Sequence, residues 1–395
     1  MRGRAIRGWV ILGAIALARI GFGYQFQTVA SLGPELIRRF GLDYAALGEL
    51  IGAYMVAGVF IALPLGLLGR RFGDRTVLGG GLALMALGAV VSAAAAGAEG
   101  IAAGRVLAGV GAVGMTVLQS KVIADWFPGR RFMLAISISV GGYPLGIGLA
   151  QITTPVLSQI WGWPAAFLAG AAIMAAATAL FVGSFRPAPD EPDSVARGGF
   201  RMPGRAECLL LVVAGLIWTA YTSAYTGYLS YTPSLMAVRG EGLVLTGVVM
   251  AFATWGNVIG TLSGGALAGR WGAWPVFATG TAVMTVAIAG MGVLDWPVVW
   301  GALIGLPGSI QPGVIVAVGT LSARPENRAA GMGLFYTTYY LGGAVVPALC
   351  GRAADAMGTP AGAMYAAAFV SVLALPIYLL HRRMAASASV GLGAL

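Results

Sequence analysis

The stretch that decides the fold is Gly66-Leu-Leu-Gly-Arg-Arg-Phe-Gly-Asp-Arg75, a short basic segment between two long apolar runs. A degraded copy, Gly265-Ala-Leu-Ala-Gly-Arg-Trp-Gly272, begins 199 residues later. The aligned copies place Gly265 with Gly66, Arg270 with Arg71, and Gly272 with Gly73. A repeat at this distance predicts a chain built from two halves with the same orientation.

The composition excludes a soluble globular class. The mean hydropathy is +0.85, and 58% of the 395 residues are hydrophobic while only 10% are charged. A helix needs about 20 apolar residues to cross the hydrocarbon core of a bilayer, so about twelve crossings fit the length. One of these twelve spans is expected at 298–322. The sequence predicts an all-α membrane protein of twelve transmembrane helices in two six-helix bundles related by pseudo-two-fold symmetry.

The net charge of +10 reports topology, because the basic residues fall at the ends of apolar runs. Placing the N-terminus in the cytoplasm puts seventeen of the 24 basic residues on that side. We therefore expect cytoplasmic N- and C-termini, in what we take to be a bacterial inner membrane. Nucleic acid is not expected as a partner, since the basic residues do not share one soluble face.

The repeated segment resembles the signature of the major facilitator superfamily, Gly-x-Leu-small-Asp-Arg-x-Gly-Arg-Arg, which lies between helices 2 and 3. Arg105-Val-Leu-Ala-Gly-Val-Gly-Ala112 is similar to a second family pattern, Arg-x-x-Gln-Gly-x-Gly-Ala. Within the family, Arg19-Ile-Gly-Phe-Gly-Tyr24 looks similar to the cyanate and nitroimidazole permease-like branch. The resemblance implies a twelve-helix secondary transporter that works by alternating access.

The resemblance also implies that the turn latches the cytoplasmic side through an acidic residue. Arg70 takes the family's acidic position here, and Asp74, four residues on, could serve instead through Arg130, Arg131 or Arg328. The residues assigned to this gating turn lie in the two copies of the segment: Gly66, Arg70, Arg71, Gly73, Asp74, Gly265, Arg270 and Gly272.

The two halves are expected to meet at a polar linker. Residues 186–206 contain four prolines and three acidic residues, a composition that cannot bury a core. We expect an N-terminal six-helix bundle over 1–185, the linker over 186–206 and a C-terminal six-helix bundle over 207–395. The resemblance implies that the helices expected over 132–157 and 243–268 meet at the interface between the halves. Their glycines (Gly142 and Gly146; Gly256, Gly260 and Gly264) suit that place, with contact inside one half as the alternative.

Two arginines lie inside apolar helices, where a charge costs roughly 2.5–3.5 kcal/mol on insertion scales. Arg19 is halfway along the first expected helix, over 8–30, and Arg105 lies about one turn into the fourth (helix 4), over 101–123. A guanidinium binds oxyanions through two parallel hydrogen bonds, so both are candidate contacts of an anionic solute. The alternative is structural: Arg105 snorkels outward or hydrogen-bonds backbone carbonyls, and Arg19 pairs with Glu49 or an unwound carbonyl.

Further candidate substrate contacts are polar side chains on the helices that line the cavity in the family. On the face of helix 4 that carries Arg105 they are Thr116 and Gln119. In the second half they are Tyr221, Tyr225, Asn257 and Gln311, and the tyrosines belong to an aromatic stripe that could equally be packing. Lys121 is expected to pair with Asp125 one helical turn on.

The acidic residues map to the ends of the spans, and the one histidine, His381, lies at a cytoplasmic end. This distribution disfavours a proton-coupled cation exchanger, which needs a carboxylate at mid-membrane. We expect a monomer that moves a small anion across the lipid bilayer. The sequence does not decide whether a proton or another ion is coupled to this movement. No cofactor, metal or enzyme site is expected. The alternatives are an efflux carrier for neutral or amphipathic compounds and a non-transporting membrane sensor or assembly partner.

Overall fold

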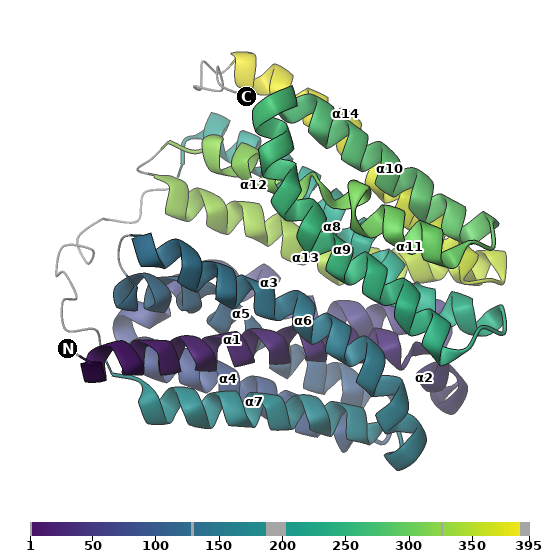
Figure 1. The fold of residues 1–395 in the computed structure, drawn as a ribbon, viewed down its shortest axis with the longest axis horizontal. Coiled ribbons are helices and arrows are strands. Elements are labelled where there is room, and N and C mark those ends of the chain that lie inside the picture. Colours follow the sequence, from purple (N-terminus) through teal and green to yellow (C-terminus); the bar gives the residue numbers. More distant parts are fainter. Residues whose placement is uncertain (1, 128–129, 187–202, 325–326, 388–395) are drawn as a thin grey trace. The chain divides into compact units, whose positions relative to one another are not determined.

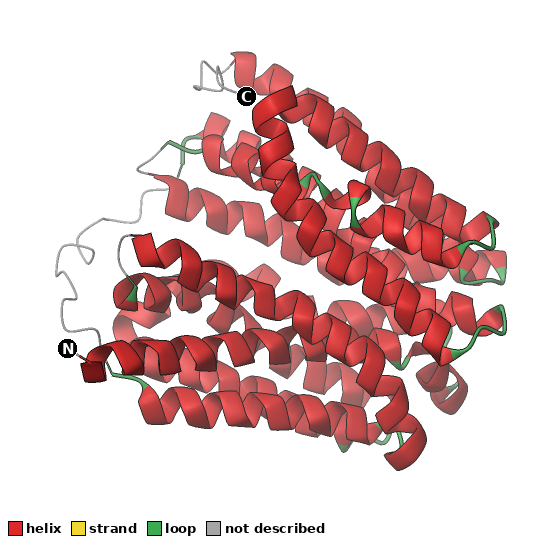
Figure 2. Cartoon of the chain, viewed as in Figure 1, coloured by secondary structure: helices red, strands yellow, loops and turns green. Residues whose placement is uncertain are grey.

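The computed structural model describes residues 2–127, 130–186, 203–324 and 327–387, and all of its regular elements are helical (Figure 2). Contacts divide the chain into two compact units. Unit 1 comprises Met1–Leu32 and Ala53–Gly199, and unit 2 comprises Gly33–Gly52 and Phe200–Leu395. The two units are taken separately below.

Unit 1 is built around the first helix of the chain. Figure 1 shows α1 running between α6 and α7, which it contacts along its length, while α4 packs against α5 and α7. The helices are α1 (Arg2–Ser31), α3 (Tyr44–Phe72, from Ala53 onward), α4 (Asp74–Ala93), α5 (Ala98–Trp126), α6 (Arg130–Trp161) and α7 (Pro164–Ser184).

In unit 2, α8 packs against α13 and α14, α10 packs against α14, and α9 packs against α11. The elements are α2 (Gly33–Phe40), α8 (Arg205–Val238), α9 (Leu243–Trp271), α10 (Ala273–Val293), α11 (Pro297–Gly305), the 3₁₀ turn η2 (Pro307–Ser309), α12 (Pro312–Leu321), α13 (Arg328–Met357) and α14 (Ala361–Ser387). The unit also takes in the start of α3, which precedes the predicted linker. The assignment of 1–185 and 207–395 as the two bundles stays a prediction.

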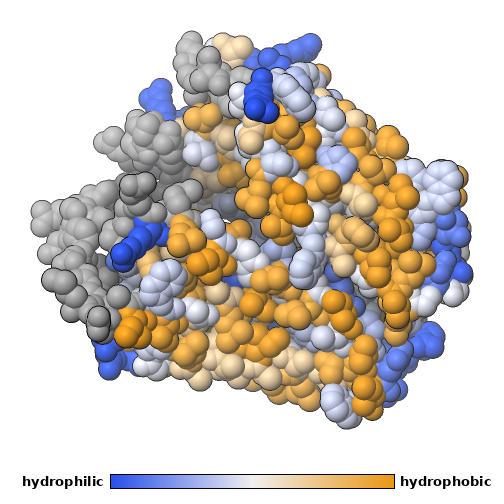
Figure 3. Space-filling model, viewed as in Figure 1, coloured by the Kyte–Doolittle hydropathy of each residue, from blue (hydrophilic) through white to orange (hydrophobic). Residues whose placement is uncertain are grey.

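The helices are long and apolar enough to cross a membrane. Among the described residues, eleven spans meet this requirement, and α13 covers the position of the remaining expected crossing. On the face shown in Figure 3, hydrophobic side chains cover the middle of the helices and hydrophilic ones gather toward their ends. This distribution is what a bilayer requires, since its core offers charged side chains no water.

The repeated segment forms the same turn in both copies. Gly73 ends α3 with φ +77° and leads into α4, and Gly272 ends α9 with φ +86° and leads into α10. A positive φ of this size favours glycine, because a Cβ would clash with the backbone. Gly265 and Arg270 lie exposed in the last turns of α9. Gly66, Arg70 and Arg71 lie in the end of α3 whose side chains are outside the described part.

The span expected as one helix over 298–322 is broken. It ends as α11 at Gly305, passes through η2 and resumes as α12 at Pro312. Pro307 and Pro312 both lack the amide hydrogen that a helix needs, and they are only five residues apart. The prediction of a continuous helix was therefore wrong at this point.

The close-packing glycines meet partners inside their own units. A Cβ on Gly142 would lie 2.8 Å from the carbonyl oxygen of Ala16 in α1, and Gly146 lies closer still to the carbonyl of Ile20. In unit 2, Gly256 faces Gly305 of α11 in the same way. The alternative, contact inside one half, is therefore present at these glycines. Their role at an interface between the halves stays a prediction.

Candidate functional site

The midpoint of α1 carries a cation held against aromatic faces. The guanidinium carbon of Arg19 lies 5.8 Å from the ring centroid of Phe22 and 5.8 Å from that of Tyr143 in α6. The two rings are 4.9 Å apart, and Arg19 is half-buried. Gly142 produces this arrangement, because its missing side chain lets α6 come close enough to place Tyr143 beside Arg19.

The aromatic cluster continues from Arg19 toward the second arginine. Phe22 stacks on Tyr54 at 5.9 Å, and Phe26 lies 6.2 Å from both Tyr54 and Tyr143. These spacings are those of favourable aromatic pairs. We name Phe22, Phe26, Tyr54 and Tyr143 the aromatic cluster of unit 1.

Arg105 lies at the far side of this cluster and is buried, with 2% of its surface exposed. Its guanidinium lies 5.0 Å above the ring of Tyr54 and donates to the carbonyl oxygens of Gln25 at 3.1 Å and Phe26 at 3.4 Å. The structural alternative predicted for this residue, bonding to backbone carbonyls, is therefore present. Arg105 ties α5 to the part of α1 that carries the aromatic residues.

The cavity beside Arg105 is small. Its volume of about 10 Å³ is no larger than one water needs. Gln25 crosses it, donating to the carbonyl of Met85 at 3.1 Å and accepting from the hydroxyl of Tyr54 at 3.2 Å. Arg19, half-buried on the other side of the cluster, is the more accessible of the two cations.

The other candidates of α5 make contacts of their own. The hydroxyl of Thr116 donates to the carbonyl of Ala112 at 2.9 Å, one helical turn earlier. The buried Gln119 accepts a hydrogen bond from Ser139 of α6 at 3.2 Å. Thr116 and Gln119 both follow Arg105 along α5, but Thr116 is bonded within its own helix and Gln119 is bonded to α6.

In unit 2 the polar candidates gather at the broken helix. Asn257 of α9 donates to the hydroxyl of Tyr221 in α8 at 2.8 Å and to the hydroxyl of Ser309 in η2 at 2.9 Å. Gln311, which follows the turn, is buried and accepts from Thr281 of α10 at 2.7 Å. These side chains supply hydrogen-bond partners where helical geometry is interrupted, as backbone breaks at membrane depth require.

The aromatic stripe of α8 packs against α13. Trp218 lies 6.2 Å from Phe335 and 5.8 Å from Tyr221, whose ring is parallel to that of Tyr225 at 6.5 Å. The hydroxyl of Tyr225 donates to the carbonyl of Ala253 at 3.2 Å. In this structure the stripe is an interhelical contact.

Asp74 at the first gating turn forms an ion pair inside unit 1. Its carboxylate lies 2.6 Å from the ammonium of Lys121, which also lies 3.4 Å from Asp125. The predicted pairing of Lys121 with Asp125 is confirmed. The latch from Asp74 to Arg130, Arg131 or Arg328 stays a prediction, and the side chains of Arg130 and Arg328 are outside the described part.

The carboxylates that the structure describes lie at helix ends or in connections, as the sequence predicted. Glu49 is within the second turn of α3, Glu207 is in the first turn of α8, and Asp355 is in the last turn of α13. Asp355 accepts from the backbone amides of Tyr44 and Ala45, both at 2.8 Å, and so caps the start of α3 within unit 2.

Reasoning from the sequence missed five residues of these sites: the four members of the aromatic cluster of unit 1 and Ser309. Tyr143 belongs to a Gly-Gly-Tyr-Pro segment, where adjacent glycines indicated a close helix contact but not the ring beside it. Ser309 lies in Pro-Gly-Ser-Ile-Gln-Pro, residues 307–312, whose two prolines could have predicted the break.

Comparison with curated proteins finds relatives among transporters. The chain is 24% identical over 244 residues to the MFS-type transporter pydD of Acremonium sp, which covers 60% of this chain and 42% of that one. It is 27% identical over 148 residues to the 4-hydroxybenzoate transporter PcaK of Pseudomonas aeruginosa, an alignment that covers 38% of this chain and 33% of that one. It is 28% identical over 162 residues to the gallate transporter of Pseudomonas putida, with coverages of 41% and 36%. The alignments thus span less than half the length of each relative.

Solved structures share the fold of the chain. A bacterial homolog of the human lysosomal transporter Spinster, inward-facing and occupied, aligns with a TM-score of 0.77 at 17% identity, covering 94% of this chain and 96% of that one. The inward-open xylose transporter XylE from E. coli gives 0.76 at 14% identity, covering 94% and 95%. The fold is that of an integral membrane protein. A family model that matches residues 15–347 shows that the chain belongs to the Major Facilitator Superfamily, a family of transporters and not of enzymes.

Proposed function

We propose that the chain is a secondary transporter for a small organic anion, and specifically for an aromatic carboxylate. The observation that carries the proposal is Arg19, a half-buried guanidinium at the middle of a membrane-spanning helix, held against the faces of Phe22 and Tyr143. A cation at this depth is costly, and an anionic solute that pairs with it would offset part of that cost.

The chemistry of the cluster suits a solute with both a charge and a ring. The guanidinium of Arg19 offers a planar fork for a carboxylate, and the aromatic cluster of unit 1 offers faces on which a ring can stack. Arg105 serves as a positioning residue in this proposal, because it holds the carbonyls of Gln25 and Phe26. The names of two relatives support the choice, since 4-hydroxybenzoate and gallate are aromatic carboxylates.

Transport follows from alternating access in this proposal. A solute drives the change by binding one of two conformations more tightly than the other. Thr116, Gln119, Tyr221, Tyr225, Asn257 and Gln311 remain proposed solute contacts. The bacterial inner membrane, cytoplasmic termini, a monomeric state and a coupling proton or ion are proposed with it, and the placement of basic residues supports the orientation.

Counterflow of labelled benzoate in proteoliposomes tests the proposal. We expect 4-hydroxybenzoate and gallate to compete, and benzamide, which has the same shape without the charge, to fail. Arg19→Gln should weaken the apparent affinity about 10- to 100-fold, because charge-assisted hydrogen bonds contribute about 1.5–3 kcal/mol. Arg19→Lys should recover part of it, since lysine keeps the charge but not the fork.

Arg39→Gln is the matched control, because it removes an exposed positive charge at the end of α2. It should leave benzoate affinity unchanged. The site assignment is wrong if Arg19→Gln keeps the wild-type affinity and its salt dependence. Indifference to all anions together with accumulation of apolar dyes would instead support the efflux carrier, which uses the aromatic stripe of α8.

A further inference from the structure

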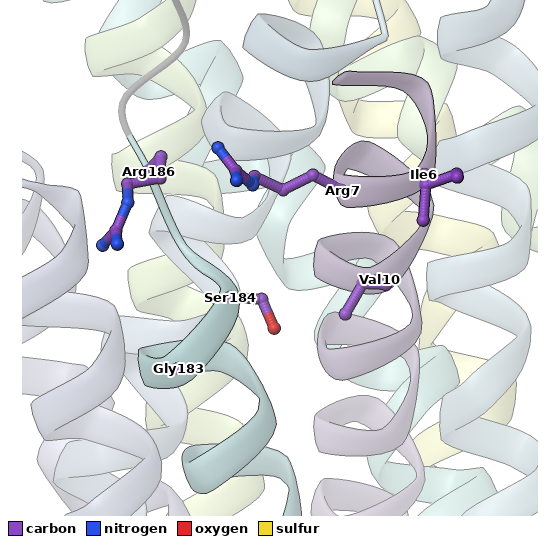
Figure 4. Close-up of a pocket in the computed structure, with 6 residues that line it drawn as sticks. All are labelled: Ile6, Arg7, Val10, Gly183, Ser184 and Arg186. Atoms are coloured by element: carbon purple, nitrogen blue, oxygen red, sulfur yellow. The ribbon is translucent and has the colours of Figure 1, made fainter. Parts of the chain in front are cut away.

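A second cavity lies at one end of unit 1, away from the aromatic cluster. Its volume is about 310 Å³. Figure 4 shows Arg7 reaching from α1 toward the end of α7, the side chain of Arg186 directed away from Arg7, and the hydroxyl of Ser184 directed into the gap between α1 and the end of α7. Its lining comes from the first turns of α1 and the end of α7: Ile6, Arg7, Val10, Gly183, Ser184 and Arg186.

The charge of this cavity favours an anion. Arg7 and Arg186 are both exposed, and none of the ion pairs recorded among the described residues involves either of them. Two guanidinium groups that line one cavity attract an anion. A phosphate fits this role, because its oxygens accept the paired hydrogen bonds that arginine donates.

The position of the cavity favours the phosphate of a lipid headgroup over a free phosphate. Arg7 directly precedes the apolar run 8–18 of α1, and Arg186 directly follows the apolar run 164–185 that contains α7. Basic residues at the ends of apolar runs place the cavity where the hydrocarbon core gives way to the headgroup layer. Ile6 is 64% exposed, and Val10 continues the same apolar wall toward the core. A ligand at this level meets charge on one side and apolar surface on the other, as a phospholipid does.

We propose that this cavity binds an anionic phospholipid, with its phosphate held by the lining arginines Arg7 and Arg186 and an acyl chain along Ile6 and Val10. Ser184 adds a hydroxyl beside the phosphate. Gly183 keeps the opening clear, because a side chain at this position would extend into unoccupied space. The site is independent of the solute, so it stands or falls apart from the transport proposal.

Native mass spectrometry of the purified full chain tests this site with dihexanoyl phosphatidylglycerol, using dihexanoyl phosphatidylcholine and inorganic phosphate as comparison ligands. We expect the wild type to prefer phosphatidylglycerol over phosphatidylcholine at least tenfold. Arg7→Gln/Arg186→Gln should weaken phosphatidylglycerol binding about 30-fold, the loss of about 1 kcal/mol for each basic residue. Arg324→Gln/Arg383→Gln removes the same charge from exposed positions outside the cavity and should change binding less than twofold.

Gly183→Leu keeps all charges and should also weaken binding, because its side chain fills the opening. It provides a second test if the double arginine variant fails to fold. The proposal is overturned if the control pair loses as much binding as the cavity pair, or if Gly183→Leu binds like the wild type. It is also overturned if the wild type does not distinguish the two lipids. Inorganic phosphate binding as tightly as the lipid would show a site for soluble anions instead.

Discussion

Gly146 of α6 is the position where a single methyl group should disturb unit 1 most clearly. A Cβ there would lie 2.8 Å from both the carbonyl carbon of Ile20 and the amide nitrogen of Tyr24 in α1. The carbonyl oxygen of Ile20 lies closer still, and all three are backbone atoms of a packed helix, so the two helices would have to separate by more than about 1 Å to reach ordinary contact. Overpacking of this kind costs about 1–3 kcal/mol.

The gain in helix propensity from Gly146→Ala, about 1 kcal/mol, offsets part of this cost. Gly141 is the matched control in the same helix, because a Cβ there meets nothing within 4 Å. Gly141→Ala should therefore stabilise by up to about 1 kcal/mol. We expect the two variants to differ by about 2 kcal/mol, or roughly 4–8 °C in Tm for a unit of this size.

Thermal unfolding of the purified variants, followed by intrinsic fluorescence, measures this difference. Gly146→Ala should also move Tyr143 away from Arg19 and weaken benzoate binding, whereas Gly141→Ala should not. Equal Tm values for the two variants would refute the reasoning, because the close approach of α6 to α1 would then carry no energetic weight.

Three further substitutions probe single contacts. Asp355→Ala removes the cap on the amide of Tyr44 and should lower stability by about 0.5–2 kcal/mol, read as a lower Tm, whereas an unchanged Tm would show that the cap is dispensable. Asp74→Asn breaks the ion pair with Lys121, in which the Asp74 side chain is only 11% exposed. It should shift the balance between inward- and outward-open states, measured by distances between spin labels. An unchanged balance would show that the segment acts only as a tight turn and not in gating. Arg105→Ala leaves two carbonyls and a cavity and should cost about 2–5 kcal/mol, so wild-type unfolding would contradict its structural role.

The sequence predicted correctly those features that depend only on residues close together in the chain. The repeated Gly66 and Gly265 segments predicted two equivalent turns, and the positive φ of Gly73 and Gly272 confirms them, because only the backbone of the turn itself decides that geometry. The pairing of Lys121 with Asp125 is also local, since helical geometry brings side chains four residues apart together.

The partners of residues far apart in the chain could not be predicted. The sequence placed Arg105 on a polar face of its helix but could not show that α1 would present the carbonyls of Gln25 and Phe26 to it. The glycines of α6 likewise indicated close contact without naming the helix that would come close. Many helices are apolar enough to pair with α6, and periodicity does not distinguish among them.

The sequence by itself determined that this protein is a helical membrane protein with a duplicated turn, because the number of apolar spans, the charges at their ends and the repeat depend on composition and local geometry alone. That it is a transporter followed from its resemblance to the major facilitator superfamily. The tertiary structure decided the placement of the cations: Arg19 came to lie between Phe22 and Tyr143, and Arg105 became buried on backbone carbonyls. That placement depends on which helix backbones pack together, and such packing is a property of the folded unit rather than of any single segment.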